Sequence, residues 1–87
     1  METTLHQETM ALLSRFYDSF KMDDGFEWML TEEVGVMEIQ PDLRQYKTQV
    51  EANRAAEKWI TRNMQNLVRD ARREALEGRA YRARKAA

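Results

Sequence analysis

The feature that most constrains the fold is a run of helix-favouring residues from Thr48 to Glu77. The run contains neither proline nor glycine, and Ala, Glu, Arg, Leu, Met and Gln dominate it. Thr48 and Glu51 have the spacing of a capping box, in which the threonine hydroxyl accepts from the backbone amide three residues on. At about 1.5 Å per residue, the run predicts one continuous helix about 45 Å long.

Apolar residues recur every three or four positions along this run and predict a stripe that faces a core or another helix. The stripe begins with Ala52, Ala56, Trp59 and Ile60. We call its distal part, Met64, Leu67, Val68, Ala71 and Ala75, the apolar seam. Trp59 is expected to pack near Trp28, because both flank the same junction.

Arginines follow the other side of the run and continue beyond it. They are Arg62, Arg69, Arg72, Arg73, Arg79, Arg82 and Arg84. The planar guanidinium suits phosphate and carboxylate, so these residues are a candidate site for an anionic ligand or a nucleic acid. Asp70, Glu74 and Glu77 interrupt them, and no helix-turn-helix, zinc finger or aromatic RNA platform surrounds them. A solvated helix face explains the pattern as well.

The charges divide unequally between the two halves of the chain. Residues 1–43 contain two basic and ten acidic residues, whereas residues 44–87 contain twelve basic and five acidic ones. The simplest interpretation is that an acidic face and a basic face contact each other, within one chain or between chains. The alternative is an external partner for the basic half.

The N-terminal segment, residues 4–22, is expected to form an amphipathic helix. Thr4 and Gln7 have capping-box spacing, and large apolar residues between Leu5 and Phe20 fall within one arc. Gly25, after two aspartates, suits the end of this helix.

Residues 26–47 allow two interpretations. Periodicity of 3.6 favours a short helix over residues 26–33, followed by an extended link. Periodicity of two over Phe26, Trp28 and Leu30 instead favours a strand, with a second strand over residues 34–39 and a turn at Pro41. The second interpretation would make a small β-hairpin within this segment and an α+β fold.

Reactive groups are scarce. The chain has no cysteine, a single histidine (His6) and three isolated glycines. These facts exclude thiol chemistry and disulfides, and they give no support to a catalytic triad or a glycine-rich phosphate loop. The acids between Asp23 and Asp42 lack the spacing of a calcium loop. We therefore expect no enzyme activity, no metal and no cofactor.

Together these patterns predict one mainly α domain over residues 1–87. A helical hairpin joins residues 4–22 to the long helix of residues 48–77, residues 26–47 connect them, and residues 79–87 form a basic tail. The first helix, about 28 Å long, would cover only the beginning of the second, so the apolar seam should overhang and pair with a second copy or another protein. We expect a cytoplasmic, non-enzymatic interaction module such as a regulator, adaptor or inhibitor, without a membrane segment. Nucleic-acid or phosphate binding is the alternative function.

Overall fold

The computed structural model describes residues 3–34 and 44–86, which are mainly helical and include one small β-hairpin. The elements are α1 (Leu5–Leu13), a 3-10 turn (Ser14–Phe16), β1 (Tyr17–Met22), β2 (Gly25–Leu30), a second 3-10 turn (Glu32–Val34), α2 (Gln49–Asn63) and α3 (Gln65–Ala86). The strands pair with each other in antiparallel fashion.

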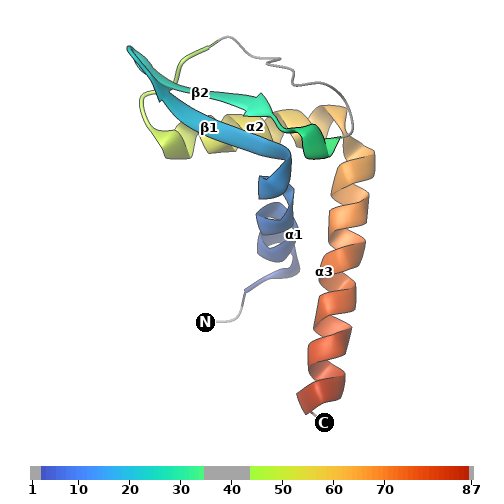
Figure 1. Cartoon of the computed structure of the whole chain (residues 1–87). Helices are drawn as coiled ribbons and strands as arrows, with labels where there is room; N and C mark the ends of the chain where they lie inside the picture. The colour runs from blue at the N-terminus through green and yellow to red at the C-terminus, as the bar shows by residue number, and fades with distance from the viewer. Residues whose placement is uncertain (1–2, 35–43, 87) are drawn as a thin grey trace.

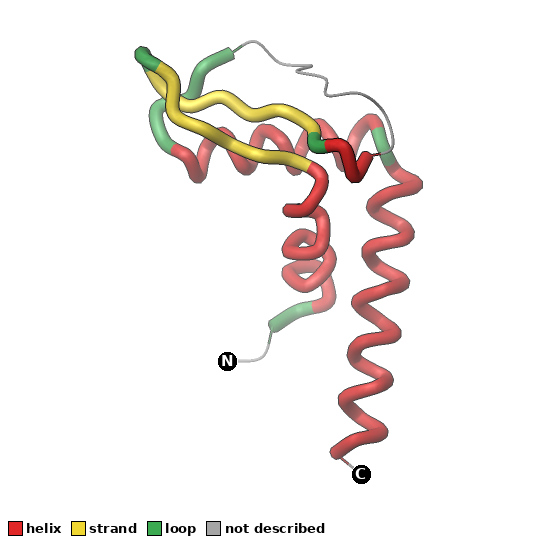
Figure 2. The backbone as a smooth tube through the Cα atoms, viewed as in Figure 1, coloured by secondary structure: helices red, strands yellow, loops and turns green. Residues whose placement is uncertain are grey.

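The elements form two arms that meet at a corner (Figure 1). In one arm the hairpin packs along α2, and in the other α1 packs against α3. The backbone trace in Figure 2 follows α1 and α3 side by side, away from the corner. This confirms that the N-terminal helix packs against the C-terminal helical segment.

Helix α1 begins where the sequence predicts but ends earlier than predicted. The Thr4 hydroxyl accepts from the Gln7 amide, and the Gln7 side chain accepts from the Thr4 amide, which completes the capping box. The helix ends at Leu13, so the prediction of one helix over residues 4–22 is wrong. From Tyr17 onward the chain is extended because Tyr17 and Phe20 suit a strand and β2 supplies a partner.

The hairpin is present, but its strands are not those expected. Met22 is opposite Gly25, so Asp23 and Asp24 form a two-residue turn instead of following a helix end. The period-two pattern was the correct one for residues 25–30: Trp28 and Leu30 are buried, and the helix expected over residues 26–33 is absent. The partner is β1 rather than residues 34–39, most of which lie outside the described residues, as does Pro41.

The expected long helix is two helices with an elbow at Met64. The Thr48 hydroxyl accepts from the Glu51 amide at the start of α2, as predicted. Met64 has an extended φ of −132° and ends α2, while its carbonyl accepts from Leu67 at the start of α3. The side-chain Nδ2 of Asn63 donates to the backbone carbonyl of Trp59, a contact by which asparagine competes with regular helical bonding. The two helices then leave in different directions (Figure 1).

Beyond the elbow, α3 is longer at its C-terminal end than expected. It continues through Gly78 to Ala86, so residues 79–86 are helical rather than a separate tail. Gly78 costs helix stability but does not end the helix, because the arginines and alanines around it are good helix formers. The basic residues of the predicted tail therefore extend the helix surface.

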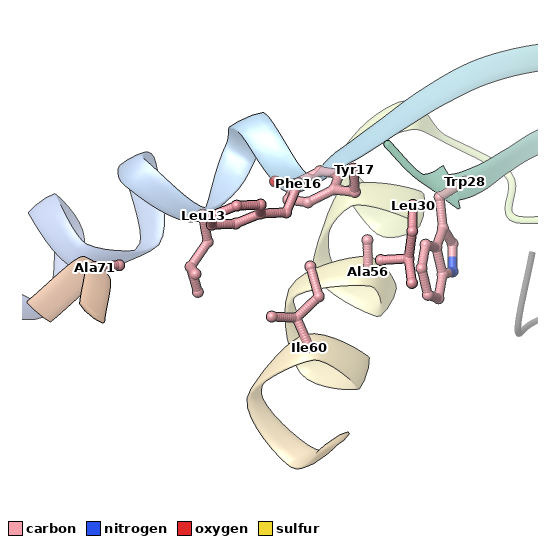
Figure 3. Close-up of a cluster of buried hydrophobic side chains, with 8 residues drawn as sticks. All are labelled: Leu13, Phe16, Tyr17, Trp28, Leu30, Ala56, Ile60 and Ala71. Carbon is pink, nitrogen blue, oxygen red and sulfur yellow. The ribbon is translucent and has the colours of Figure 1, made fainter. Parts of the chain in front are cut away.

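One hydrophobic core crosses the corner and holds both arms. Figure 3 shows its members: Leu13, Phe16, Tyr17, Trp28, Leu30, Ala56, Ile60 and Ala71. The predicted neighbours Trp28 and Trp59 are confirmed, with ring centroids 6.0 Å apart and planes tilted by 53°. Because Leu13 and Ala71 from one arm join Trp28 and Ile60 from the other, the angle between the arms depends on shared packing.

Candidate functional site

The apolar seam lies inside the chain's own core. Ala71 and Ala75 are buried, while Met64, Leu67 and Val68 are half-buried and pack against core residues. Helix α1 covers this side of α3, since the elbow turns α3 toward it. The expectation of an overhanging seam is therefore wrong, and contact with a second chain no longer rests on these residues.

Two of the candidate arginines connect α3 to α1 at the end of this helix pair that lies away from the elbow. Arg79 Nε donates to a carboxylate oxygen of Glu8 at 3.0 Å, and the Arg82 guanidinium donates to the other oxygen at 3.3 Å. Arg79 also donates to the carbonyl of Thr3 at 2.7 Å. Glu8 is thus shared by two arginines of α3, and it joins the acidic half of the chain to the basic half.

The remaining candidates divide between the two arms. Arg73 contacts Asp70, one turn earlier in the helix, at 3.4 Å. Arg62 is exposed in the last turn of α2, on the other side of the elbow. The elbow therefore places Arg62 on a different helix from the other candidate arginines, so the set does not follow one continuous helix as expected.

The side of α3 away from α1 is the strongest candidate interface. We call it the outer face, and it consists of Arg69, Arg72, Arg73, Leu76, Ala80 and Arg84, with Glu77 at its edge. All are exposed, opposite buried Ala71 and Ala75. Apart from the adjacent pairs 72/73 and 76/77, they follow one another at intervals of three or four residues. In the described part of the chain, no carboxylate lies within ion-pair distance of Arg69, Arg72 or Arg84.

An apolar residue lies among these charges. Leu76 is 49% exposed, one of the few large hydrophobic side chains so exposed in the described residues. It follows Arg72 by one helical turn, so the two side chains are neighbours on the helix surface. An exposed leucine flanked by arginines can exclude water from charge-assisted hydrogen bonds when another surface covers it.

A second surface, of opposite charge, lies at the other arm. Asp18, Glu32 and Glu33 surround an open hollow of about 300 Å³, whose other lining residues are Met29, Leu30 and Thr31. All three acids are exposed, and none is in an ion pair among residues 3–34 and 44–86. We call this surface the acidic hollow.

A buried tyrosine among the described residues has a pKa that the fold shifts. The Tyr17 hydroxyl donates to Glu57 Oε1 at 2.9 Å and joins β1 to α2. Burial raises the pKa of Tyr17 well above its usual range, and the hydrogen bond and charge of Glu57 raise it further. A phenol held in its protonated form is a poor base or nucleophile, and its hydrogen bond joins two elements of the fold.

The described residues hold no group of three or more His, Asp and Glu side chains arranged to bind a metal ion. Within the same residues, no helix is both long and apolar enough to cross a bilayer. Comparison of the chain with family models, with curated proteins and with solved structures finds no match. The functional argument therefore depends on the surfaces themselves.

Sequence reasoning missed both the acidic hollow and the role of Glu8. Asp18 lies in the segment that was expected to be helical, and its hollow forms only when β1 pairs with β2. Glu8 and Arg79 are 71 residues apart, a separation at which no local pattern predicts a contact. The alternation of Phe26, Trp28 and Leu30 was the one available signal for the hairpin.

Proposed function

We propose that this chain is a small non-enzymatic interaction protein that docks onto an acidic surface of a partner through the outer face of α3. The observation that supports the proposal is the set of arginines at positions 69, 72 and 84, which lack carboxylate partners in the described residues and flank exposed Leu76. Arginine is enriched among residues that dominate binding energy, particularly where an apolar neighbour removes water.

The arrangement of α3 supports docking as well. The helix is anchored along one side by α1, through Ala71, Ala75 and the ion pairs of Glu8. Its opposite side is therefore presented on a rigid element rather than on a loop, which lowers the entropy cost of binding. A helix face of this kind binds as a unit through residues spaced three, four and seven apart.

A site-specific crosslinking experiment tests the proposal. Leu76 is replaced by the photoreactive amino acid p-benzoylphenylalanine, and the chain is irradiated in cells that naturally express it. Val50, a similarly exposed apolar residue on α2, is replaced in the control. We expect adducts from position 76 that are absent from position 50 and that disappear when Arg72→Glu and Arg73→Glu are added. Equal adducts from both positions would refute docking through the outer face.

Binding of nucleic acid or another phosphate ligand is the second candidate. The same three arginines favour it, because guanidinium groups bind phosphate oxygens through two parallel hydrogen bonds. This function requires that labelled duplex or single-stranded oligonucleotides shift at 50 mM salt and that affinity fall steeply as salt rises. Retention of the shift after Arg69→Gln, Arg72→Gln and Arg84→Gln would exclude the outer face as the site.

A further inference from the structure

The outer face of α3 and the acidic hollow have opposite charges, and each places charged side chains beside an apolar one. One has arginines around Leu76, and the other has three carboxylates beside Met29. We propose that the partner of the outer face is a second copy of this chain, whose acidic hollow receives Leu76 and the arginines beside it. This inference rests on the proposed function and names its partner.

The two surfaces do not meet within one chain. The buried side of α3, at Ala71 and Ala75, faces α1, so the outer face points away from α1. In the described residues, the ion pairs of α3 involve Glu8, Arg15 and its own Asp70, and none reaches the hollow. The attraction between the two surfaces can therefore be satisfied only between copies.

The contact would combine charge pairing with a small apolar centre. Carboxylates at Asp18, Glu32 and Glu33 can accept paired hydrogen bonds from guanidinium groups at the rim. Half-buried Met29 offers a flexible thioether against which the Leu76 side chain can pack. Exposed ion pairs contribute little individually, so a network of them around an apolar contact gives weak, salt-sensitive association.

The symmetry of the assembly follows from the use of two different surfaces. Each copy has one basic face and one acidic hollow, so contact between copies is heterologous. Such contacts make a closed ring or an open chain of subunits, and a reciprocal dimer forms if both contacts fit at once. In every case, the average mass rises with protein concentration.

Sedimentation velocity of the full chain at 10–200 µM tests the inference with two charge-reversal variants. One variant carries Arg72→Glu and Arg73→Glu, and the other carries Glu32→Arg and Glu33→Arg. A control carries Arg54→Glu and Lys58→Glu, which reverse two exposed charges on α2. Circular dichroism confirms that each variant is folded.

We expect the wild type and the control to associate in 50 mM NaCl, with an association constant at least tenfold lower in 500 mM NaCl. Each reversal variant alone should be monomeric. An equimolar mixture of the two variants should associate again, because each restores opposite charge to the other's altered surface.

A wild type that stays monomeric at 200 µM in 50 mM NaCl would overturn the inference, as would a mixture that fails to associate. Loss of association in the outer-face variant only would overturn it too, because the hollow would then not be the receiving surface. Crosslinks from position 76 to a different protein would overturn the inference that the partner is a second copy, but they would leave the proposed docking function intact. Absence of any specific crosslink at position 76 would refute both.

Discussion

The Tyr17 hydroxyl donates a 2.9 Å hydrogen bond to the carboxylate of Glu57 and ties the first strand of the hairpin to the centre of α2. The two residues are 40 positions apart. Their contact lies beside the packed side chains of Trp28, Leu30 and Ile60, which belong to the same core. One of the contacts that hold this arm together is therefore a hydrogen bond whose donor is titratable.

Replacing Tyr17 with Phe should lower the free energy of unfolding by about 1 kcal/mol at neutral pH, because the hydrogen bond is lost. The raised pKa of Tyr17 predicts how this difference changes with pH. Below about pH 10 the phenol is protonated in both the folded and unfolded states, so the contribution is constant. Above that pH the unfolded state releases the proton first, and the advantage of the wild type falls as pH rises. Urea unfolding of both proteins at pH 7, 9, 10 and 11 measures the difference in their free energies of unfolding. A wild-type advantage that grows with alkalinity would contradict this prediction.

Gly25→Ala should destabilise the hairpin. A β-carbon at this position would lie 2.7 Å from the carbonyl oxygen of Tyr46, which is backbone and cannot rotate away. Tyr46 also exchanges two backbone hydrogen bonds with Phe26, of 2.7 and 2.8 Å, so a shift of one segment strains both. We expect a loss of about 1–3 kcal/mol in the free energy of unfolding, measured in urea. A variant as stable as the wild type would show that residues 44–46 relax freely.

Gly78→Ala should have the opposite effect. Gly78 lies within α3, and an added β-carbon would meet only the end of the flexible Arg82 side chain, at 3.4 Å. Alanine in a helix interior is favoured over glycine by about 1 kcal/mol. We expect an increase in the free energy of unfolding of about 0.5–1 kcal/mol. The comparison with Gly25→Ala separates the effect of available space from the general effect of replacing glycine. Destabilisation by Gly78→Ala would mean that neighbouring atoms of α1 lie closer to Gly78 than the structure shows.

Glu8→Gln should loosen the far end of the α1–α3 pair. The variant removes the charge shared by Arg79 and Arg82 and leaves an amide of similar size. Because the arginines are partly exposed, we expect a loss of about 1 kcal/mol in low salt, which shrinks in 0.5 M NaCl. Chemical unfolding at both salt concentrations measures the difference. Glu77→Gln is the matched control, because Glu77 has no ion pair among residues 3–34 and 44–86. Equal losses in both variants would rule out a specific role for Glu8.

Local signals in the sequence predicted local structure well. The capping residues Thr4 and Thr48 mark the starts of α1 and α2, because a threonine hydroxyl and the amide three residues on form a self-contained interaction. The pairing of the N-terminal helix with the C-terminal segment also followed from the apolar arcs. Packing of Trp28 against Trp59 was predicted from their position at one junction and is confirmed.

The elbow at Met64 was not predicted, for a physical reason. The apolar spacing continues without a phase shift from Ile60 through Met64 to Leu67 and Ala71, so periodicity alone does not distinguish one helix from two. The weak signal was the pair Asn63 and Asn66, which have low helix propensity and flank the break. Burial of Ile60 against the hairpin and of Ala71 against α1 stabilises the bent arrangement, and such tertiary contacts are invisible to local propensity.

The candidate surfaces could not be predicted fully either, because they too depend on tertiary contacts. The arginines of the outer face were identified as a set, but the elbow removed Arg62 from it, and Glu8 engages Arg79 and Arg82. Within the apolar seam, Leu67, Val68, Ala71 and Ala75 lie on one face of α3, whereas Met64 lies at the elbow. That face is occupied by α1, a partner supplied by the chain itself.

The contact between Glu8 and Arg79 joins α1 to α3. During synthesis α1 is made before the segment of α3 that covers its apolar side. The α1–α3 arm consequently cannot close until the segment between the two helices has been made, and its closure brings two distant parts of the sequence together in a long loop. A chain truncated before α3 would leave the apolar side of α1 uncovered, so such a truncation removes an arm of the fold and not merely a few basic residues.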